Sequence, residues 1–462
     1  SKSFGSAGNR KKWTFSCWFK LGLFSQPGRF FSAGTSSTER TNIFYHSSNS
    51  ESGIAFYSYV GSVKAQGNTT AKLRDPSAWY HLVFQFDCAN STNSDRVKIY
   101  INGVEHAVTF HVHPANIDHY IGGNVAHYVG RGADGYSFDG YLAESHYVNG
   151  QLLSPSNFGE LNDDNVWVPK EFDGSYGTNG FYLKFADNSS NSALGTDSSG
   201  NSNTWTVNNL SVAAGSGNDS LIDTPTNYDA SSGNNGGNYC TLNPLHATAI
   251  VGSGTSPTIT NGNLDVTGNN QETAGTFGAS SGKWYYEVTQ HDAGNFTNGV
   301  GWYREGTSEE SIYRDDGAFR FNGSESSYGA SWQSAGDVIG IALDIDNNTI
   351  AFYKNGASQG NAKTNLPAGT YIPLIYNRQV SDLSANFGQR PFAYTPPTGH
   401  KSLCTQNLPD PTIADGSTAM DVALWTGNGS TQSISGLSMS PDWAWVKQRN
   451  TSRNHQIVDT VR

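Results

Sequence analysis

The spacing of the acidic residues indicates whether this chain could hydrolyse sugars. Two carboxylates at alternate positions of one strand point to the same side of a sheet and can serve as the acid and the nucleophile of a glycoside hydrolase. The segment YLAESHYV, residues 141–148, carries Glu144 with no second acid at two-residue spacing. Glu160 and Asp163, in GELNDDN, fall in a turn-rich stretch that is typical of a solvated loop. The sequence therefore predicts that the protein is not an enzyme.

Metal-ligating residue types occur at two places. His111 and His113, in FHVHP, are two residues apart, so on a strand they would point the same way and could supply two metal nitrogens. Without neighbouring cysteines, hydrogen-bonded surface histidines are the preferred interpretation. Asp134 and Asp139, in GADGYSFDG, are candidate calcium ligands at the rim of a sandwich, and ordinary Asp-Gly turn chemistry is the alternative.

Aromatic and arginine side chains mark candidate contacts to a ligand. The segment WYREGTSEESIYRDD, residues 302–316, contains Tyr303, Arg304, Tyr313, Arg314 and Asp315. We expect it to be an exposed binding loop, since such residues commonly anchor interfaces, although Trp302 equally suits a core position. Tyr128 and Arg131, in AHYVGRG, are second candidates in the first half of the chain, where a structural loop is the alternative.

Composition excludes several classes of partner. The formal charge is -11, with 28 basic and 39 acidic residues, which argues against nucleic acid because phosphate binding needs clustered Lys and Arg. No apolar run approaches the ~18 residues that span a bilayer, so we expect no membrane insertion. The cysteines, four in 462 residues, are too sparse for a disulfide framework and are expected to be buried free thiols.

The elements expected to position these candidate residues are antiparallel β-hairpins. VKIYINGV (97–104) and IAFYKNGA (350–357) alternate inward and outward residues and then reach Asn-Gly, the dipeptide that favours a tight hairpin turn. Each follows another alternating apolar run, HLVFQFD (81–87) and VIGIALD (338–344). A chain longer than about 250–300 residues divides into domains. The pattern predicts an all-β protein with tandem antiparallel β-sandwiches.

Four segments are expected along the chain. A first sandwich occupies residues 1–172, where Trp13, Phe15, Cys17 and Phe19 share one strand face. An extended connector follows at 173–236, because 26 of the 34 residues from 187 to 220 are Ser, Thr, Asn, Asp or Gly. A second sandwich occupies 237–409. Residues 410–462, with Trp443, Trp445 and Lys447 on one face, are the start of a further β module, which suggests a fragment or a tail that completes another module's sheet.

The order WTFSCWFK, WYHLVFQFD, RVKIYINGV and FDGYLAESHYVNGQLLSPSNFGE resembles a laminin-G or concanavalin A-like lectin sandwich, a jelly-roll fold. GKWYYEVT, VGWY, GDVIGIALDIDNNTIAFYKNG and ANFGQRPFAY resemble a SPRY domain. Together with the bridging segments TNGFYLKFADNSS and GNYCTLNPL, the combination is similar to bacteriophage tail fibre and virion appendage proteins.

That resemblance implies receptor binding at the virion surface during host attachment. The expected ligand is a host-surface carbohydrate or protein receptor bound without catalysis, and the expected assembly is a homotrimer that contacts other virion proteins. Calcium is the one cofactor implied for such lectin-like sandwiches. The alternatives are a structural spacer or decoration protein of the virion and a polysaccharide depolymerase.

Overall fold

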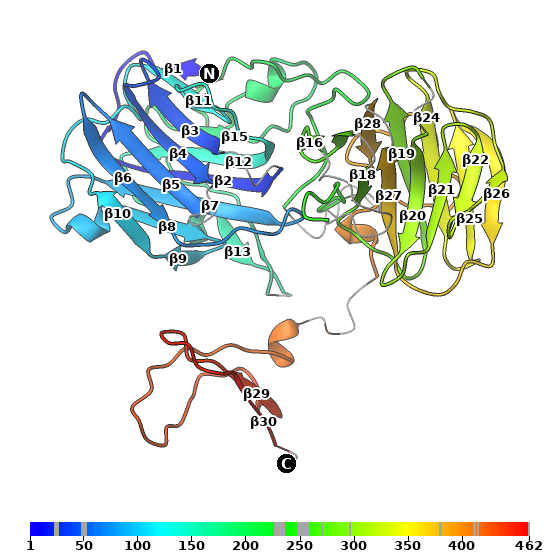
Figure 1. The fold of residues 1–462 in the computed structure, drawn as a ribbon. Coiled ribbons are helices and arrows are strands. Elements are labelled where there is room, and N and C mark those ends of the chain that lie inside the picture. Colours follow the sequence, from blue (N-terminus) through cyan, green and yellow to red (C-terminus); the bar gives the residue numbers. More distant parts are fainter. Residues whose placement is uncertain are drawn as a thin grey trace. The chain divides into compact units, whose positions relative to one another are not determined.

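The computed structural model describes residues 1–22, 27–47, 53–163, 165–225, 236–246, 258–268, 271–294, 297–377, 381–409, 413 and 415–460. Within these ranges the elements are strands β1–β30 and the short 3-10 helices η1–η5. The chain forms two compact units, one of Ser1–Glu160 with Trp167–Leu408 and one of Leu161–Val166 with Pro409–Arg462. The first unit contains both β-sandwiches, so the predicted fold class is confirmed (Figure 1).

The first sandwich packs a seven-stranded sheet against a six-stranded one. The seven-stranded sheet has the order β1 (Lys2–Ser3), β11 (Ala126–Val129), β3 (Gly28–Gly34), β4 (Arg40–His46), β5 (Gly53–Tyr59), β6 (Val63–Thr69) and β10 (Val108–Val112). The six-stranded sheet has the order β15 (Phe181–Leu183), β12 (Gly140–Asn149), β2 (Lys12–Leu21), β7 (Trp79–Asp87), β8 (Val97–Ile101) and β9 (Val104–His106). A small sheet pairs β13 (Gly159–Leu161) with β14 (Trp167–Pro169).

Alternation along β2 builds the core of this sandwich, as the sequence predicts. Trp13, Phe15, Cys17 and Phe19 are buried in one cluster with apolar side chains of the opposite sheet. The Trp13 ring stacks on Phe86 with ring centroids 4.9 Å apart, and Phe15 stacks on Phe31 at 4.8 Å. The first contact lies within the six-stranded sheet, and the second joins it to the inner side of the seven-stranded sheet, whose other side is left for different chemistry.

The second sandwich repeats the arrangement. Its seven-stranded sheet has the order β16 (Thr258–Thr260), β17 (Asp265–Gly268), β28 (Ser381–Asn386), β19 (Lys283–Gln290), β24 (Val338–Asp344), β25 (Thr349–Lys354) and β26 (Ala357–Thr364). Its six-stranded sheet has the order β18 (Gln271–Ala274), β27 (Tyr371–Asn377), β20 (Gly299–Arg304), β21 (Glu310–Arg314), β22 (Ala318–Phe321) and β23 (Ser324–Ser327).

Both predicted Asn-Gly hairpins are present. Asn102 and Gly103 have φ of 49° and 81° between β8 and β9, and Asn355 and Gly356 have φ of 48° and 79° between β25 and β26. Two successive positive φ values define the two-residue turn that matches the twist of antiparallel strands. The preceding runs pair as β7 with β8 and as β24 with β25.

The expected connector is less separate than its composition suggests. Its residues Phe181–Leu183 form β15 and extend the six-stranded sheet of the first sandwich. Trp205 packs against Phe181 with ring centroids 4.7 Å apart and belongs to the same core. Two buried aromatic anchors are enough to order a chain that is otherwise rich in Ser, Asn and Gly. Residues 226–235 of this segment lie outside the described residues.

A buried ionic cluster joins the connector to both sandwiches. Lys20 Nζ on β2 lies 2.9 Å from Asp223 Oδ2, 2.8 Å from Asn238 Oδ1 and 2.8 Å from the Tyr239 carbonyl oxygen. The Lys20 and Asp223 side chains have no solvent exposure. Trp79 Nε1 donates to the other carboxylate oxygen of Asp223 at 2.9 Å. The full set of hydrogen bonds to Lys20 offsets the cost of burying its charge.

The second unit is small and has little core of its own. Its strands β29 (Trp443–Val446) and β30 (Gln456–Asp459) form a hairpin in which Trp443 and Trp445 share an exposed face, with ring centroids 6.3 Å apart. Lys447 lies beyond the end of β29.

Elsewhere in the chain, the four cysteines are buried and free, as expected. Across the described ranges, no helix has the length and apolar character needed to cross a membrane.

Candidate functional site

The side of the first seven-stranded sheet that faces away from the core carries three rows of cross-strand neighbours. We call it the outer face and define it by these registers, which are Tyr128, Ser32, Asn42, Tyr57 and Gln66 in one row, Ala126, Gly34, Arg40, Tyr59 and Val63 in the second, and Arg29, Phe44, Ala55 and Asn68 in the third. Directly paired residues of an antiparallel sheet project to the same face. The face therefore combines phenol, amide and guanidinium groups.

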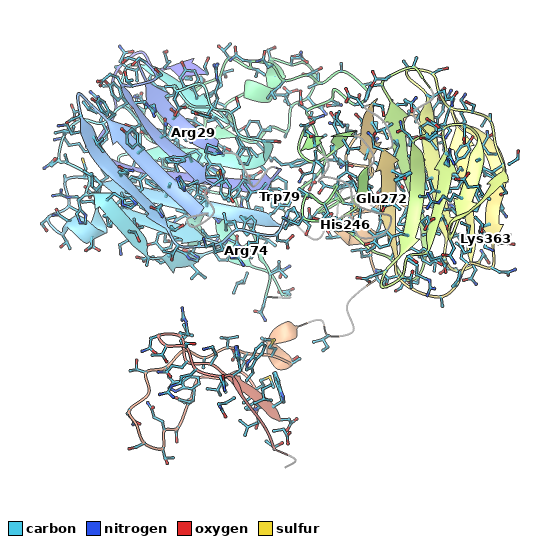
Figure 2. The ribbon with its side chains drawn as sticks, viewed as in Figure 1. Arg29, Arg74, Trp79, His246, Glu272 and Lys363 are labelled. Carbon is cyan, nitrogen blue, oxygen red and sulfur yellow. The ribbon has the colours of Figure 1, made fainter. Side chains whose placement is uncertain are left out.

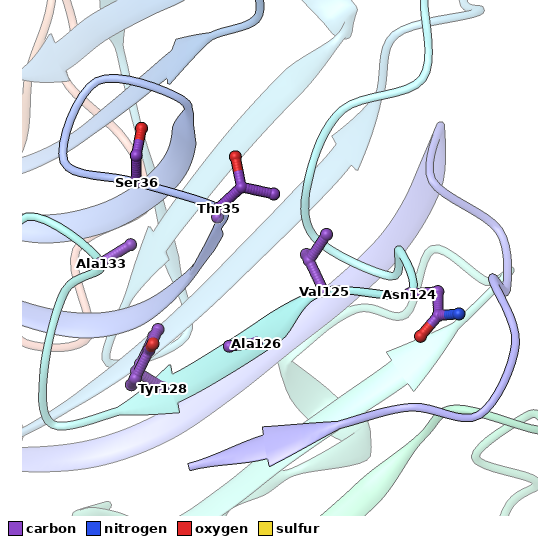
Figure 3. A pocket seen from close by; sticks show the side chains of 8 residues that line it. Thr35, Ser36, Asn124, Val125, Ala126, Tyr128 and Ala133 are labelled. Atoms are coloured by element: carbon purple, nitrogen blue, oxygen red, sulfur yellow. The ribbon is translucent and has the colours of Figure 1, made fainter.

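A pocket of about 350 Å³ opens on this face beside β11 (Figure 3). Its lining residues are Gly34, Thr35, Ser36, Asn124, Val125, Ala126, Tyr128 and Ala133. The polar groups are hydroxyls, one amide and one phenol, with no charged side chain among them. A concave site with a few convergent polar groups is the usual form of a small-ligand site. The predicted residue Tyr128 lies in this pocket, and Arg131 is exposed nearby in the chain.

Residues 130–138 form a tight loop over the outer face, which we call the strap. Phe138 donates its amide to the Gly130 carbonyl at 2.8 Å, and Gly132 donates to the Tyr136 carbonyl at 2.8 Å. The Ala133 amide donates to Ser32 Oγ at 3.1 Å, which fixes the strap to β3. Ala133 thereby becomes one wall of the pocket.

Asp134 is the main anchor of the strap. Its Oδ2 accepts hydrogen bonds from Arg29 Nη2 at 2.9 Å and Asn42 Nδ2 at 3.0 Å, and Arg40 Nε lies 3.1 Å away. Burial acts to raise the pKa of Asp134, but the hydrogen bond and charge of Arg29 and the charge of Arg40 hold this pKa below its usual value. The carboxylate is thus neutralised by two arginines, an arrangement that disfavours calcium.

The second predicted calcium ligand has a different environment. Asp139 Oδ1 accepts from the Gly262 amide at 3.3 Å, and burial raises the pKa of this carboxyl. The two aspartates therefore do not converge on one ion. Within the described ranges, no group of three or more His, Cys, Asp or Glu side chains is arranged to hold a metal.

The histidine pair is also divided. His111 Nε2 lies 2.8 Å from Asn68 Oδ1, whereas the His113 ring stacks on Phe110 with centroids 4.4 Å apart. A register shift between Phe110 and Val112 breaks the alternation that would place the two rings on one side. His111 thus fits the interpretation as a hydrogen-bonded surface histidine, whereas His113 is a surface histidine held by ring stacking.

The arginines of the outer face are held against aromatic rings. Arg29 lies on the first sandwich (Figure 2). Its guanidinium carbon is 4.3 Å from the Phe44 ring centroid and 5.0 Å from that of Tyr136. The Arg40 guanidinium carbon lies 5.2 Å from the Tyr57 centroid. Tyr136, on the strap, is 52% exposed. Both arginines are engaged by Asp134 and by rings, so they act mainly to order the aromatic side chains.

The segment 302–316 of the second sandwich is not the expected binding loop. It spans the paired strands β20 and β21, and alternation turns Tyr313 into the core. Tyr313 and Asp315 have no solvent exposure, and Tyr303 is 9% exposed and packs against Ile312 and Leu374. The expectation that these three side chains form an exposed contact surface is wrong, because Tyr303 and Tyr313 lie on paired strands and Asp315 is buried directly after the end of β21.

The two predicted arginines of that segment are separated and paired. Arg304 Nη2 lies 3.1 Å from Glu309 Oε2, while Arg314 Nη2 lies 2.9 Å from Asp316 Oδ2 and its Nη1 contacts Glu325. The register places Arg304 and Arg314 at opposite ends of the β20–β21 ladder. They do not converge on one ligand.

Glu144 has an unusual backbone. Its φ is 49°, at a register shift of β12 between Ala143 and His146. The Tyr182 hydroxyl donates to its carboxylate, and burial raises the pKa of Glu144, with a smaller contribution from the charge of Glu171. His146 Nε2 lies 3.8 Å away, and burial lowers the pKa of this imidazole to about 3. Positive φ at a bulged residue with a shifted pKa is a recognised mark of functional sites.

Other candidate catalytic groups have structural surroundings. Glu160 Oε2 lies 3.4 Å from Lys170 Nζ at the surface, and Asp163 is exposed in a turn. Two pentapeptides of the form GxSxG occur at residues 278–282 and 356–360. The first precedes β19 and the second enters β26. A nucleophilic serine of this motif needs a strand, a sharp turn and a helix, so neither is such a site.

Sequence reasoning missed the arginines and tyrosines of β3, β4 and β5. The available signal was the run GIAFYSY, in which Phe56 and its neighbours Tyr57 and Tyr59 place aromatic rings on both faces of one strand. An aromatic ring on the face away from the core needs another reason to be there.

Comparisons with known proteins identify three regions. Residues 3–157 match the concanavalin A-like lectin/glucanases superfamily (Laminin_G_3), residues 283–390 match the SPRY domain, and residues 415–462 match a domain of unknown function, DUF7483. The RKP E3 ubiquitin-protein ligase of Arabidopsis thaliana is 35% identical over 128 residues, which are 24% of this chain and 10% of that protein. Ran-binding protein 9 of Homo sapiens is 32% identical over 128 residues, covering 25% of this chain and 17% of that protein.

A third relative is the ATP-dependent RNA helicase DDX1 of Xenopus laevis, 33% identical over 138 residues, covering 28% of this chain and 18% of that protein. The chain thus spans less than a fifth of each of these relatives. Among solved structures, the SPRY domain of human HERC1 is 19% identical with a TM-score of 0.27, covering 31% of this chain and 96% of that one. By the matches of residues 3–157 and 283–390, the chain combines a concanavalin A-like laminin-G domain with a SPRY domain.

Proposed function

We propose that the protein is a non-enzymatic binding protein that attaches to a glycan or receptor on a host cell, as a subunit of a bacteriophage fibre or virion appendage. The pocket beside Tyr128 carries this proposal. Its hydroxyl, amide and phenol groups suit a ligand rich in hydroxyl groups, since each such group can donate or accept a hydrogen bond. The phage context and the trimeric assembly rest on the resemblance of the whole domain combination.

Glycan-array binding and adsorption to host cells test this function directly. We expect saturable binding by the purified chain and a loss of at least about tenfold in affinity for Tyr128→Ala, because truncating an aromatic hot spot at the centre of a binding site costs about 2 kcal/mol or more. Tyr353→Ala, on β25 of the second sandwich, is the matched control and should bind normally. Sedimentation analysis of the same sample tests the trimer. Absence of binding to glycans and to cells at every concentration would favour the structural spacer or decoration protein.

A protein receptor is a second candidate, favoured by the SPRY domain. Ran-binding protein 9 is, by its name, a protein-binding relative. Protease treatment of host cells separates the two ligands, because it should abolish adsorption to a protein receptor and preserve adsorption to a glycan.

The depolymerase alternative rests on Glu144 alone. Its raised pKa and the nearby charge of Glu171 are the observations in its favour. Incubation with host polysaccharide and measurement of new reducing ends tests it. We expect the same background from the native chain and from Glu144→Gln, and reducing ends that appear only with the native chain would establish hydrolysis.

A further inference from the structure

The strap divides the outer face into two regions with different chemistry. Asp134 holds it across β3 and β4 by its contacts with Arg29, Arg40 and Asn42. On one side lies the pocket, with Tyr128 on β11. On the other side lie the half-buried tyrosines of β5, Tyr57 and Tyr59.

We propose that these regions are two subsites for one neutral oligosaccharide chain, which enters the pocket at one end, passes over the strap and stacks on the β5 tyrosines at the other. This inference rests on the proposed glycan-binding function and adds the length and charge of the ligand. Tyr128 and Tyr57 occupy the same row, on strands three steps apart in the sheet. At about 4.8 Å per step they are separated by about 14 Å, more than one sugar ring can span.

The chemistry of each region suits a sugar. Tyr57 and Tyr59 are at alternate positions of one strand, so their rings lie on the same face. Tyrosine offers an apolar ring for the flat face of a sugar and a hydroxyl for its substituents. Gln66, paired with Tyr57 on β6, adds an amide that can bond hydroxyl groups.

Charge indicates a neutral chain. The pocket has no charged lining residue. The arginines beside the tyrosines are already engaged, Arg29 by Asp134 and the Phe44 and Tyr136 rings, and Arg40 by Asp134 and the Tyr57 ring. A hydroxyl-rich ligand therefore meets matching groups on both sides of the strap. An acidic chain would find Arg29 and Arg40 already occupied by Asp134 and would meet only the exposed Arg131 on the strap itself.

The strap bridges the subsites through its exposed residues Arg131 and Tyr136. Gly132 permits this arrangement, because a Cβ there would lie 2.0 Å from Asp134 Oδ1. Gly132→Ala should loosen the anchor and with it Ala133, a wall of the pocket, so its effect reports on the strap and the pocket together.

Calorimetric titration with cello-, malto- and chito-oligosaccharides of one to six units tests the inference. In the series that binds, we expect the hexasaccharide to bind at least about tenfold more tightly than the monosaccharide, because a linked second contact adds affinity without a new binding event. Tyr57→Ala should reduce hexasaccharide affinity about tenfold and leave monosaccharide affinity unchanged. Tyr128→Ala should weaken both. Tyr353→Ala is the control, and thermal melting of each variant verifies that it is folded.

A double-variant cycle sharpens the result. For the hexasaccharide, Tyr57→Ala and Tyr128→Ala should be non-additive, since the loss of either subsite removes the benefit of the link. Three results would each overturn the two-subsite inference and leave the proposed function standing. They are equal affinities for the monosaccharide and the hexasaccharide, additive affinity losses in the double variant, and preferential binding of a uronate-containing chain with an affinity that falls as salt is added. If the native protein bound no oligosaccharide of any series and did not adsorb to host cells, both the two-subsite inference and the proposed function would be overturned.

Discussion

Substituting Lys20 by Met is expected to weaken the junction of the two sandwiches severely. The Met side chain keeps most of the volume of Lys20 but removes its ammonium group and the contacts to Asp223, Asn238 and Tyr239, at 2.9, 2.8 and 2.8 Å. Asp223 would then keep only neutral donors, among them Trp79 Nε1, in a site with no solvent exposure. Breaking a buried ion pair by removing one partner costs about 3–5 kcal/mol.

The magnitude can be measured by urea denaturation at pH 7, followed by tryptophan fluorescence because Trp79 contacts Asp223. We expect the free energy of unfolding to fall by about 3–5 kcal/mol in Lys20→Met. Asp223→Asn should cost a similar amount, since it leaves the ammonium group buried. The double variant should be more stable than the sum of the single losses indicates, with a coupling of about 1–3 kcal/mol.

A loss below about 1 kcal/mol in Lys20→Met would refute the reasoning, because surface substitutions commonly have effects of that size. Lys12→Met is the matched control. Lys12 lies on the same strand and pairs with Asp87 at 3.4 Å, but its side chain is 43% exposed. An exposed pair is worth only about 0.2–1 kcal/mol, so this variant should be close to the native protein in stability.

Three further predictions concern turns, acid and metal. Gly356→Ala should lower the melting temperature more than Gly360→Ala does. Both positions have positive φ (79° and 84°), but only at Gly356 would a Cβ meet Tyr394, at 2.5 Å. Equal losses of melting temperature would contradict this reasoning. Burial lowers the pKa of His127 to about 4, and its Nε2 accepts from the Gly122 amide, so the imidazole is neutral in the fold. Stability from this group is complete above the unfolded pKa of about 6.5 and declines as the pH falls from there to about 4, the pKa in the fold. Denaturation curves at pH 7.5 and 4.5 should show the decline, with a smaller one in His127→Gln. EDTA should leave the melting temperature unchanged because Arg29 and Arg40 neutralise Asp134, and a rise on adding calcium would show that a site exists.

The sequence predicted the fold well because the strongest local signals are those of hairpins. Asn-Gly after an alternating run determines the turn, the register and the inward face together, and both such turns are present at Asn102 and Asn355. The boundary of the first sandwich was less accurate, since Phe181 and Trp205 join its core from a segment of loop-like composition. A few buried aromatic residues outweigh the average composition around them.

The candidate site was less predictable, for a physical reason. Exposure on a strand depends on which face is covered, and composition does not report that. Tyr313 looks like a contact residue in a segment rich in polar residues, yet pairing of β21 with β20 and β22 buries it. Asp315, directly after β21, is buried as well, and its backbone bonds to Asn298 and Trp332. Tyr57 and Tyr59 look like core residues beside Phe56, yet they lie on the outer face.

The same distinction explains why ligand binding is assigned to the seven-stranded sheet of the first sandwich. Three outward polar residues of its partner sheet, Ser16, Lys20 and His81, have no exposure. His81 lies between the rings of Trp18 and Trp167, at 4.7 and 6.0 Å, and accepts a hydrogen bond from Trp167 Nε1 at 2.9 Å. β14, which carries Trp167, and the connector residue Asp223 cover that face and satisfy its polar groups. In the described part of the first sandwich, the pocket and the partly exposed tyrosines lie on the opposite sheet, so a ligand has access there.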